Sequence, residues 1–451
     1  MTSISLFIPV QPPRSTDWQP IWRELSGERL RNTVYGIPQP AFDLPIRTRK
    51  ALGITIHSLM DPEAVERVLL SNKANYLRPR LAQRLLSSLV GNGLLSAEGD
   101  DWRTQRRIVA PTFAPGAVAG MAQTMTQCAV DNIARWPAGP AQIDMAEEAT
   151  HTTMAIIANS LFAGDSRLTN PQASDYISQL LVVAGQARLM AVLGLQDWDP
   201  SPGMRRARRA RNWLRQTLTE MVRDRGPDGG GDDFFGGMIR SLGEHFPPEQ
   251  AITLAVDNAI TFYLAGHETT ANALAWSIYC LAAQPGLQEE ARAEAIAAKS
   301  YPASERIDHL ELLKQIFEET MRLYPPAPRF AREALAPDEL AGRPIAKGEL
   351  VAIWPWVIHR HRALWNDPDH FDHTRFAPEN RAKLHRFQYI PFGGGPRVCV
   401  GARFATMEAL LILAQWLCER RFTLPQGFVP DPVGSVTLRP RGGMPLMTEP
   451  V

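Results

Sequence analysis

The spacing of apolar residues predicts a mainly helical chain. From about residue 100 to 320, apolar positions recur mostly at helical intervals. Clusters of glycine and proline interrupt this pattern, and we expect turns there. These clusters lie at residues 137–140, 200–203 and 226–231. Strand-like runs are expected around residues 53–57 and from about 335 to 360, as at Glu349–Ile353. The expected fold class is therefore mainly α with a smaller β portion.

Two of the expected helices have recognisable starts. Asp61 is a suitable N-cap, and Pro62 follows at the first helical position. A much longer helical run begins at Pro247-Pro248-Glu249 and continues to about Pro285. At 1.5 Å per residue this helix would be about 50 Å long, enough to cross a domain.

Composition narrows the class of protein. Of 451 residues, 45% are hydrophobic, and the formal net charge is only +1. We therefore expect one domain over residues 1–451 with a sizeable core, after an irregular lead-in at 1–50, and no nucleic-acid partner. The four cysteines are scattered, which disfavours a disulfide framework or a zinc site. The basic run at 205–211 lacks interleaved aromatic residues and is expected to be a solvated helix face.

A glycine-rich loop at Phe392–Gly401 holds the most informative cysteine. Arg397 precedes Cys399 by two residues, and a helix-forming run follows at Phe404–Leu411. A thiolate there would lie at a helix N-terminus, where the dipole favours negative charge. The glycines let the backbone approach a large flat partner, and Arg397 could meet an anionic group on it. A haem iron with one cysteine ligand suits this arrangement, whereas a lone cysteine is otherwise most often a small buried hydrophobe.

The register of phenylalanine, glycine, arginine, cysteine and glycine in this loop resembles the haem-binding loop of the cytochrome P450 family. The resemblance extends from about residue 50 to the end of the chain. It implies one compact fold with haem b between the long central helix and the helix after the loop. It makes Cys399 the iron ligand and places Phe392, Gly401 and Ala265 against the haem.

The middle of the long helix carries Ala265-Gly266-His267-Glu268-Thr269-Thr270. Glycine and threonine are poor helix formers, and threonine hydroxyls can bond backbone carbonyls and loosen the ladder. The segment resembles the family's acid–alcohol pair, which makes Glu268 and Thr269 the catalytic residues that deliver protons to bound dioxygen. Taken alone, the same segment is also compatible with a buried helix that carries an incidental polar patch. His267 is expected to be structural, or a minor member of a proton relay, rather than an iron ligand.

Two further motifs support the resemblance. Glu319 and Arg322 lie one helical turn apart, and by likeness to the family they join Arg375 in a buried, structural triad. The spacing Trp102-x-x-x-Arg106 resembles a propionate-binding motif of the family. Its other propionate partners correspond to residues Arg332 and Arg397, although a surface arginine is the default for any one of them.

The resemblance implies a monooxygenase that hydroxylates or epoxidises a small hydrophobic substrate with dioxygen. Ferredoxin and ferredoxin reductase are the expected electron donors, docking at a face formed by Arg103, Arg107 and Arg403. The N-terminus lacks a basic signal region, and no stretch of about 20 apolar residues occurs. The expected type is therefore bacterial and cytoplasmic, without a membrane anchor.

Substrate choice is expected to depend on segments that the family varies. These are residues 80–98, residues 180–200, the helix face near Phe262 and Ala265, residues 327–330, and the turn at Val436-Thr437. Arg329 or Arg188 could hold a carboxylate, or could point outward. A peroxide-driven or isomerising haem-thiolate enzyme and a non-enzymatic haem sensor remain as alternatives.

Overall fold

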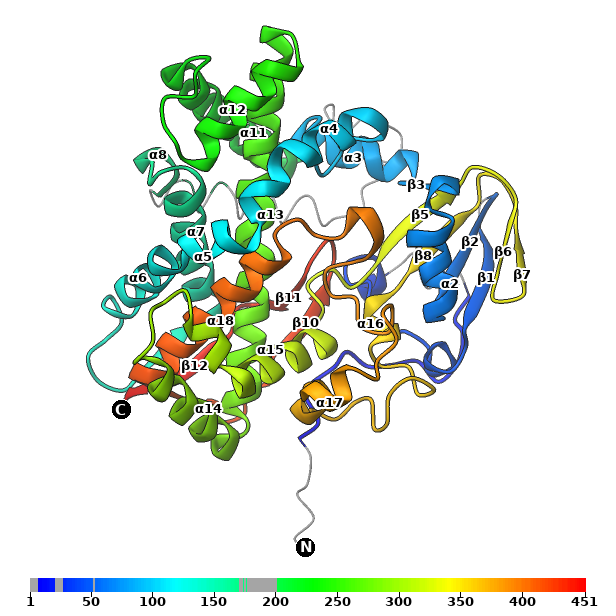
Figure 1. Ribbon diagram of the computed structural model, residues 1–451. Coiled ribbons are helices and arrows are strands. Elements are labelled where there is room, and N and C mark those ends of the chain that lie inside the picture. Colours follow the sequence, from blue (N-terminus) through cyan, green and yellow to red (C-terminus); the bar gives the residue numbers. More distant parts are fainter. Residues whose placement is uncertain (1–6, 21–26, 52, 170–172, 174–175, 177–200) are drawn as a thin grey trace, which may run out of the picture.

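The computed structural model describes residues 7–20, 27–51, 53–169, 173, 176 and 201–451 (Figure 1). The helices described are α2 Pro62–Glu66, α3 Arg80–Val90, α4 Gly99–Val109, α5 Pro115–Gly120, α6 Ala122–Ile133, α7 Met145–Leu161, α8 Ser166–Thr169, α11 Pro202–Arg225, α12 Phe234–His245, α13 Pro248–Ala282, α14 Pro285–Ala298, α15 Glu311–Leu323, α16 Pro355–Ile358, α17 Pro378–Arg381 and α18 Ala402–Glu419. The strands described are β1 Ile46–Ala51, β2 Ile54–Leu59, β3 Tyr76–Leu77, β4 Ala141–Asp144, β5 Phe330–Ala334, β6 Asp338–Leu340, β7 Arg343–Ile345, β8 Leu350–Ile353, β9 Arg420–Thr423, β10 Asp431–Gly434, β11 Leu438–Arg441 and β12 Pro445–Pro450. The prediction of a mainly helical chain with a smaller β portion is confirmed.

Helix α13 crosses the helical part of the molecule and packs against α7, α11, α12, α15 and α18 (Figure 1). Most of its side chains are buried, which explains why its sequence is apolar on nearly all sides. Its start at Pro248 and end at Ala282 agree with the predicted long helix. The shorter helix after Asp61 is also confirmed, because the Asp61 carboxylate accepts a hydrogen bond from the Ala64 N–H at 2.8 Å.

Asp257 ties two neighbouring segments to α13. Its carboxylate pairs with the Arg215 guanidinium of α11 at 2.8 Å and accepts from the Asn92 N–H at 2.7 Å. The loop comes so close that a Cβ on Gly91 would lie 2.1 Å from the Asp257 side chain. Gly91 also has a φ of +67°, so glycine suits this position on both grounds. The loop that leads into α4 is therefore held directly over the central helix.

The largest sheet has the strand order β1-β2-β8-β5-β3 and lies to one side of the helices (Figure 1). The prediction that residues 1–50 are irregular is wrong for Ile46–Lys50, which pair antiparallel with β2. Their charged residues are typical of an edge strand, where side chains face water and protect an open sheet edge. That basic composition hid the strand in the sequence. The predicted strands at 53–57 and Glu349–Ile353 correspond to β2 and β8.

The predicted triad is a buried ion pair joined by a third residue. Glu319 and Arg322 are fully buried, and the Arg322 guanidinium meets both carboxylate oxygens at 2.6 and 2.7 Å. Arg375 reaches the same carboxylate at 3.5 Å. Arg322 also donates to the carbonyls of Pro368 and His370, at 2.7 and 2.9 Å. The pair therefore holds the irregular segment before the cysteine loop as well as its own helix.

A second contact of Arg322 leads to the cysteine loop. Arg322 donates to the His359 carbonyl at 2.7 Å, and His359 Nδ1 lies 3.2 Å from the Arg322 carbonyl. His359 Nε2 accepts a hydrogen bond from the Ile390 N–H at 2.9 Å. Burial lowers the pKa of His359 to about 3, so the ring is neutral and can accept this bond. The ion pair is thereby linked to the residue where the loop begins.

We expect Glu319→Gln to lower the free energy of unfolding by about 3–5 kcal/mol, because it leaves the buried Arg322 and the half-buried Arg375 without their carboxylate. Urea denaturation followed by circular dichroism measures this change. Arg421→Gln is the matched control, since it removes an exposed pair with Glu289, at 2.8 Å, that should contribute nothing measurable. A Glu319→Gln protein as stable as the control would contradict the structural role of the triad.

Candidate active site

The cysteine loop folds tightly against neighbouring backbone. Gly395 has a φ of +68°, and a Cβ there would lie 1.9 Å from the Leu69 carbonyl oxygen. A side chain at this position is therefore excluded. The Cys399 N–H donates to the Phe392 carbonyl at 3.0 Å, which closes the loop on itself. The loop can thus present one side chain, that of Cys399, at a fixed place just before α18.

Cys399 borders a hollow inside the protein. Its side chain has accessible surface, yet burial raises the pKa of its thiol. Both observations hold when the sulfur is surrounded by protein but faces an enclosed space. The backbone of Gly401 and the charge of Arg106 act in the opposite direction and lower the pKa of the thiol. The predicted helix N-terminal environment is therefore present.

The centre of α13 also borders open space. Ala265 is exposed although its helix neighbours Leu264 and His267 are buried. The Thr269 hydroxyl donates to the Ala265 carbonyl at 2.9 Å, so the predicted competition of threonine hydroxyls for backbone carbonyls is observed. Residues Pro248–Ala282 nevertheless form an uninterrupted α-helix. A widened groove at this point stays a prediction.

Glu268 has a partner that the sequence did not indicate. Its carboxylate accepts a hydrogen bond from the Thr437 hydroxyl at 2.9 Å. Thr437 lies in the turn between β10 and β11, which was predicted to influence substrate choice. Burial raises the pKa of Glu268, whereas the Thr437 hydroxyl and the charge of Arg439 lower it. Glu268 is thus a sheltered acid held by a turn some 170 residues away in the sequence.

His267 has a structural role, as predicted. Its Nδ1 lies 2.6 Å from the Tyr263 carbonyl, and its own carbonyl accepts from the Thr153 hydroxyl at 3.2 Å. Burial lowers the pKa of His267 to about 4, so the ring is neutral near pH 7.

A cluster of arginines lies beside the cysteine loop. The Arg397 guanidinium lies over the Trp102 ring, 4.5 Å from its centre, and pairs with Glu98. Burial, followed by repulsion from Arg78 and Arg397, lowers the pKa of Arg332 to about 10. The structure therefore brings Trp102, Arg332 and Arg397 together, as the sequence predicted. Arg106, on the same helix as Trp102, is coupled electrostatically to Cys399.

Arg78 belongs to this cluster and was missed. It lies 3.8 Å from Glu98, and burial and the charge of Arg397 lower its pKa to about 10. Arg78 follows the short strand β3 and belongs to none of the motifs found in the sequence. The pairing of β3 with β5 is what brings it near Arg332.

The residues present fit a haem. A thiol with accessible surface faces a hollow, and an exposed alanine interrupts a buried helix. Beside them, Arg78, Arg332 and Arg397 share the single carboxylate of Glu98 within the described cluster. Such an excess of buried positive charge suits the two carboxylates of a haem.

The structure describes part of the predicted substrate segments. Phe262 is buried, with its ring 5.7 Å from that of Phe113 and 5.2 Å from that of Phe234. It therefore packs in the interior beside an exposed Ala265, and the role of this helix face in substrate choice stays a prediction. Residues 180–200, including Arg188, lie outside the described residues.

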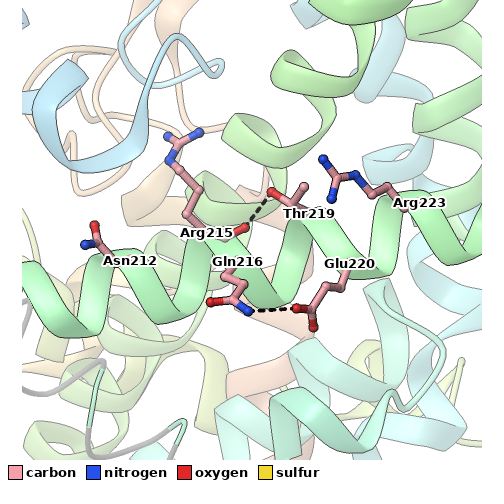
Figure 2. Close-up of a pocket in the computed structure, with 6 residues that line it drawn as sticks. All are labelled: Asn212, Arg215, Gln216, Thr219, Glu220 and Arg223. Carbon is pink, nitrogen blue, oxygen red and sulfur yellow. Dashed lines mark hydrogen bonds between the residues drawn. The ribbon is translucent and has the colours of Figure 1, made fainter.

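A further hollow runs along α11 (Figure 2). Its described lining residues all belong to that helix, and two of its hydrogen bonds are local, from Thr219 to the Arg215 carbonyl and from Gln216 to Glu220. The basic run at 205–211 lies on the same helix, with Ala207 and Ala210 buried. Because the alanines of the run face the interior, this agrees with the prediction that its arginines form a solvated face. This hollow does not contain the predicted catalytic residues.

Comparison with known proteins decides the family. The model of the family described as Cytochrome P450 matches residues 44–447. The chain belongs to the cytochrome P450 family. It is therefore a haem-thiolate enzyme of the monooxygenase type, as the motifs predicted.

Relatives of this P450 match most of its length. Cyclooctatin synthase of Streptomyces melanosporofaciens is 30% identical over 395 residues, covering 86% of this chain and 84% of the relative. A cytokinin hydroxylase of Arabidopsis thaliana is 28% identical over 411 residues, covering 87% and 79%. The crystal structure of the cytochrome P450DA heme domain superposes with a TM-score of 0.79 at 25% identity, covering 98% of this chain and 97% of that one. Among the described residues of this P450, no helix is both long and apolar enough to cross a membrane.

Thr437→Val should raise the pH at which Glu268 ionises, because valine cannot donate the hydrogen bond that stabilises the ionised carboxylate. Thr437→Ser keeps the hydroxyl and should titrate like the wild type. Infrared spectra recorded across pH follow the carboxyl band, which Glu268→Gln assigns by removing it. An identical titration in Thr437→Val and wild type would show that the hydrogen bond does not control this acid.

Proposed function

We propose that this P450 inserts one oxygen atom from dioxygen into a small hydrophobic substrate, by hydroxylating a C–H bond or epoxidising an alkene. The observation that carries the proposal is the acid–alcohol pair on α13. Glu268 is sheltered and Thr269 projects a hydroxyl from the turn that also exposes Ala265. Relatives named as hydroxylases and monooxygenases support the reaction class.

The cofactor in this proposal is haem b, with Cys399 as the iron ligand. Arg106, Arg332 and Arg397, with Trp102, would hold its propionates. Phe392, Gly401 and Ala265 would lie against its faces. When bound, haem supplies the activation of dioxygen.

The protein's own contribution is to hold substrate and to move protons. Burial raises the pKa of Glu268, which favours uptake of a proton by this carboxylate. Thr269 can pass a proton on through its hydroxyl, once that hydroxyl leaves the Ala265 carbonyl. The 2.9 Å bond between Thr269 and that carbonyl holds the side chain in one orientation until then. The turn at Thr437 limits where the Glu268 carboxylate can point.

Electrons would come from ferredoxin through ferredoxin reductase. The proposed docking face comprises Arg103, Arg107 and Arg403, which are all exposed near the cysteine side. Arg103 pairs with the neighbouring exposed Asp100, which reduces its share of the attraction. A basic face of this kind steers an acidic carrier mainly by raising the association rate.

Charge reversal at Arg107 and Arg403 should therefore lower ferredoxin-supported turnover and weaken its dependence on ionic strength. Turnover driven by a small chemical reductant serves as the control and should be unchanged. Equal ferredoxin-supported rates in the variant and wild type would remove this face from the proposal.

The reaction itself is tested with isotopically labelled dioxygen. A substrate is first selected by screening compounds for a low-to-high-spin shift. With NAD(P)H, ferredoxin and its reductase, mass spectrometry should show one labelled oxygen atom per product molecule. Product formed only with peroxide, or an isomer without added oxygen, would favour the alternative enzyme classes, and no product at all would favour a sensor.

Thr269→Val should divert electrons to peroxide, so that less product forms per NAD(P)H consumed, because proton delivery is impaired. Thr253→Val is the matched control. Thr253 lies on the same helix and bonds the Glu249 carbonyl in the same way, at 2.9 Å, but is exposed. Equal coupling in both variants would contradict a role for Thr269 in the reaction.

A further inference from the structure

Arg329 lies directly before strand β5 of the largest sheet. The Pro328 carbonyl before it accepts from the Trp356 N–H at 3.2 Å, and Phe330 after it pairs with Ile353 of β8. These contacts place Arg329 next to Trp354, with its guanidinium carbon 5.5 Å from the centre of the Trp354 ring. The backbone on both sides is held, so the guanidinium projects from a fixed point.

The guanidinium of Arg329 has no polar partner in the part of the chain that the structure describes; its contact is the Trp354 ring. Two other arginines inside the protein do have polar partners. Arg322 has a carboxylate and three carbonyls, and Arg397 has Glu98 and the Ala97 carbonyl. Five N–H donors without an acceptor are unusual for an arginine that is not in open water.

The Arg329 side chain is exposed, although protein atoms surround it on several sides. Its side chain has accessible surface, yet burial lowers its pKa, and no charged residue contributes to that shift. Both observations hold when the group lies inside the protein but borders open space. No neighbouring carboxylate therefore balances its charge.

A second donor beside Arg329 also lacks an acceptor. The indole Nε1 of Trp354 is buried without a hydrogen-bond partner. Trp276 and Trp416 also carry a buried indole N–H without a partner, so this feature is not specific to Trp354. The group that an acceptor can reach is the exposed guanidinium of Arg329 over the Trp354 ring.

This place lies close to the proposed catalytic acid along the backbone. The Leu438 N–H of β11 donates to the Pro326 carbonyl at 2.9 Å, three residues before Arg329. Thr437, the residue before Leu438, holds Glu268. The segment that carries Arg329 and the turn that holds the acid are therefore in direct contact. A ligand group at Arg329 belongs to a molecule that extends toward the reacting centre.

We propose that Arg329, held over the Trp354 ring, binds a carboxylate of the substrate, so that this P450 oxidises a hydrophobic carboxylic acid. A carboxylate matches the planar fork of one guanidinium and carries the single charge that it balances. A phosphate monoester would carry close to two charges and would need more cations. The proposal rests on the proposed monooxygenase function and adds the substrate class to it.

The test is a binding comparison between carboxylic acids and their matching alcohols. Dodecanoic acid and dodecan-1-ol form a chain pair, 4-phenylbutanoic acid and its alcohol an aromatic pair, and abietic acid and abietinol a polycyclic pair. Calorimetry with the haem-loaded protein should show tighter binding of the acid in at least one pair. Arg329→Gln should then lower the affinity for that acid at least about tenfold and change the affinity for its alcohol by less than about twofold. This is the change expected for loss of a charged hydrogen bond.

Two controls keep the result specific. Arg343→Gln removes an exposed arginine on β7 and should bind acids as the wild type does. Arg329→Lys keeps the charge but not the fork and should recover part of the affinity. The haem content of Arg329→Gln should equal that of wild type.

Three results would overturn the proposal. The first is that no acid binds more tightly than its matching alcohol, and the second is that Arg329→Gln weakens the binding of acid and alcohol equally. The third is that Arg329→Gln loses haem, which would assign Arg329 to the cofactor. Each of these would leave the monooxygenase function standing, since labelled oxygen in the product of a neutral substrate tests that function separately.

Discussion

The buried ion pair between Glu319 and Arg322 is the interaction on which the geometry of the site depends. Two fully buried charges are tolerated only because each has several partners. Those partners are backbone groups of the irregular segment between residues 359 and 372. One of them belongs to His359, whose neutral imidazole accepts a hydrogen bond from the Ile390 N–H. The loop that presents Cys399 is thus positioned by polar contacts whose loss is costly, although no regular element holds it.

The remaining charges divide the interior into two kinds of surface. Around the cysteine, Arg78, Arg332 and Arg397 share one carboxylate, so positive charge is in excess. Toward the turn at Thr437, a single carboxylate, Glu268, lies in a sheltered position with its pKa raised. A cofactor with two carboxylates fits the first region, and proton transfer fits the second. Arg329 adds a third, isolated charge near that turn.

Contacts that depend on neighbours in the sequence could be predicted. The place of Cys399 before a helix, the bond of the Thr269 hydroxyl to a backbone carbonyl and the Glu319–Arg322 pair all follow from local spacing. Arg78 and Thr437 could not be predicted, because strand pairing and a turn bring them to partners far away in the chain. The edge strand β1 was missed because its basic side chains hide the alternation of apolar positions.

The claim at the centre of this account is that the Cys399 thiolate is the axial ligand of a haem. The most direct measurement is the absorption spectrum of the reduced, carbon monoxide-bound protein. The account predicts the strongly red-shifted Soret band of thiolate-ligated haem in the wild type and its complete loss in Cys399→Ala. A histidine-type Soret band in the wild type, or a red-shifted band that survives in Cys399→Ala, would contradict it.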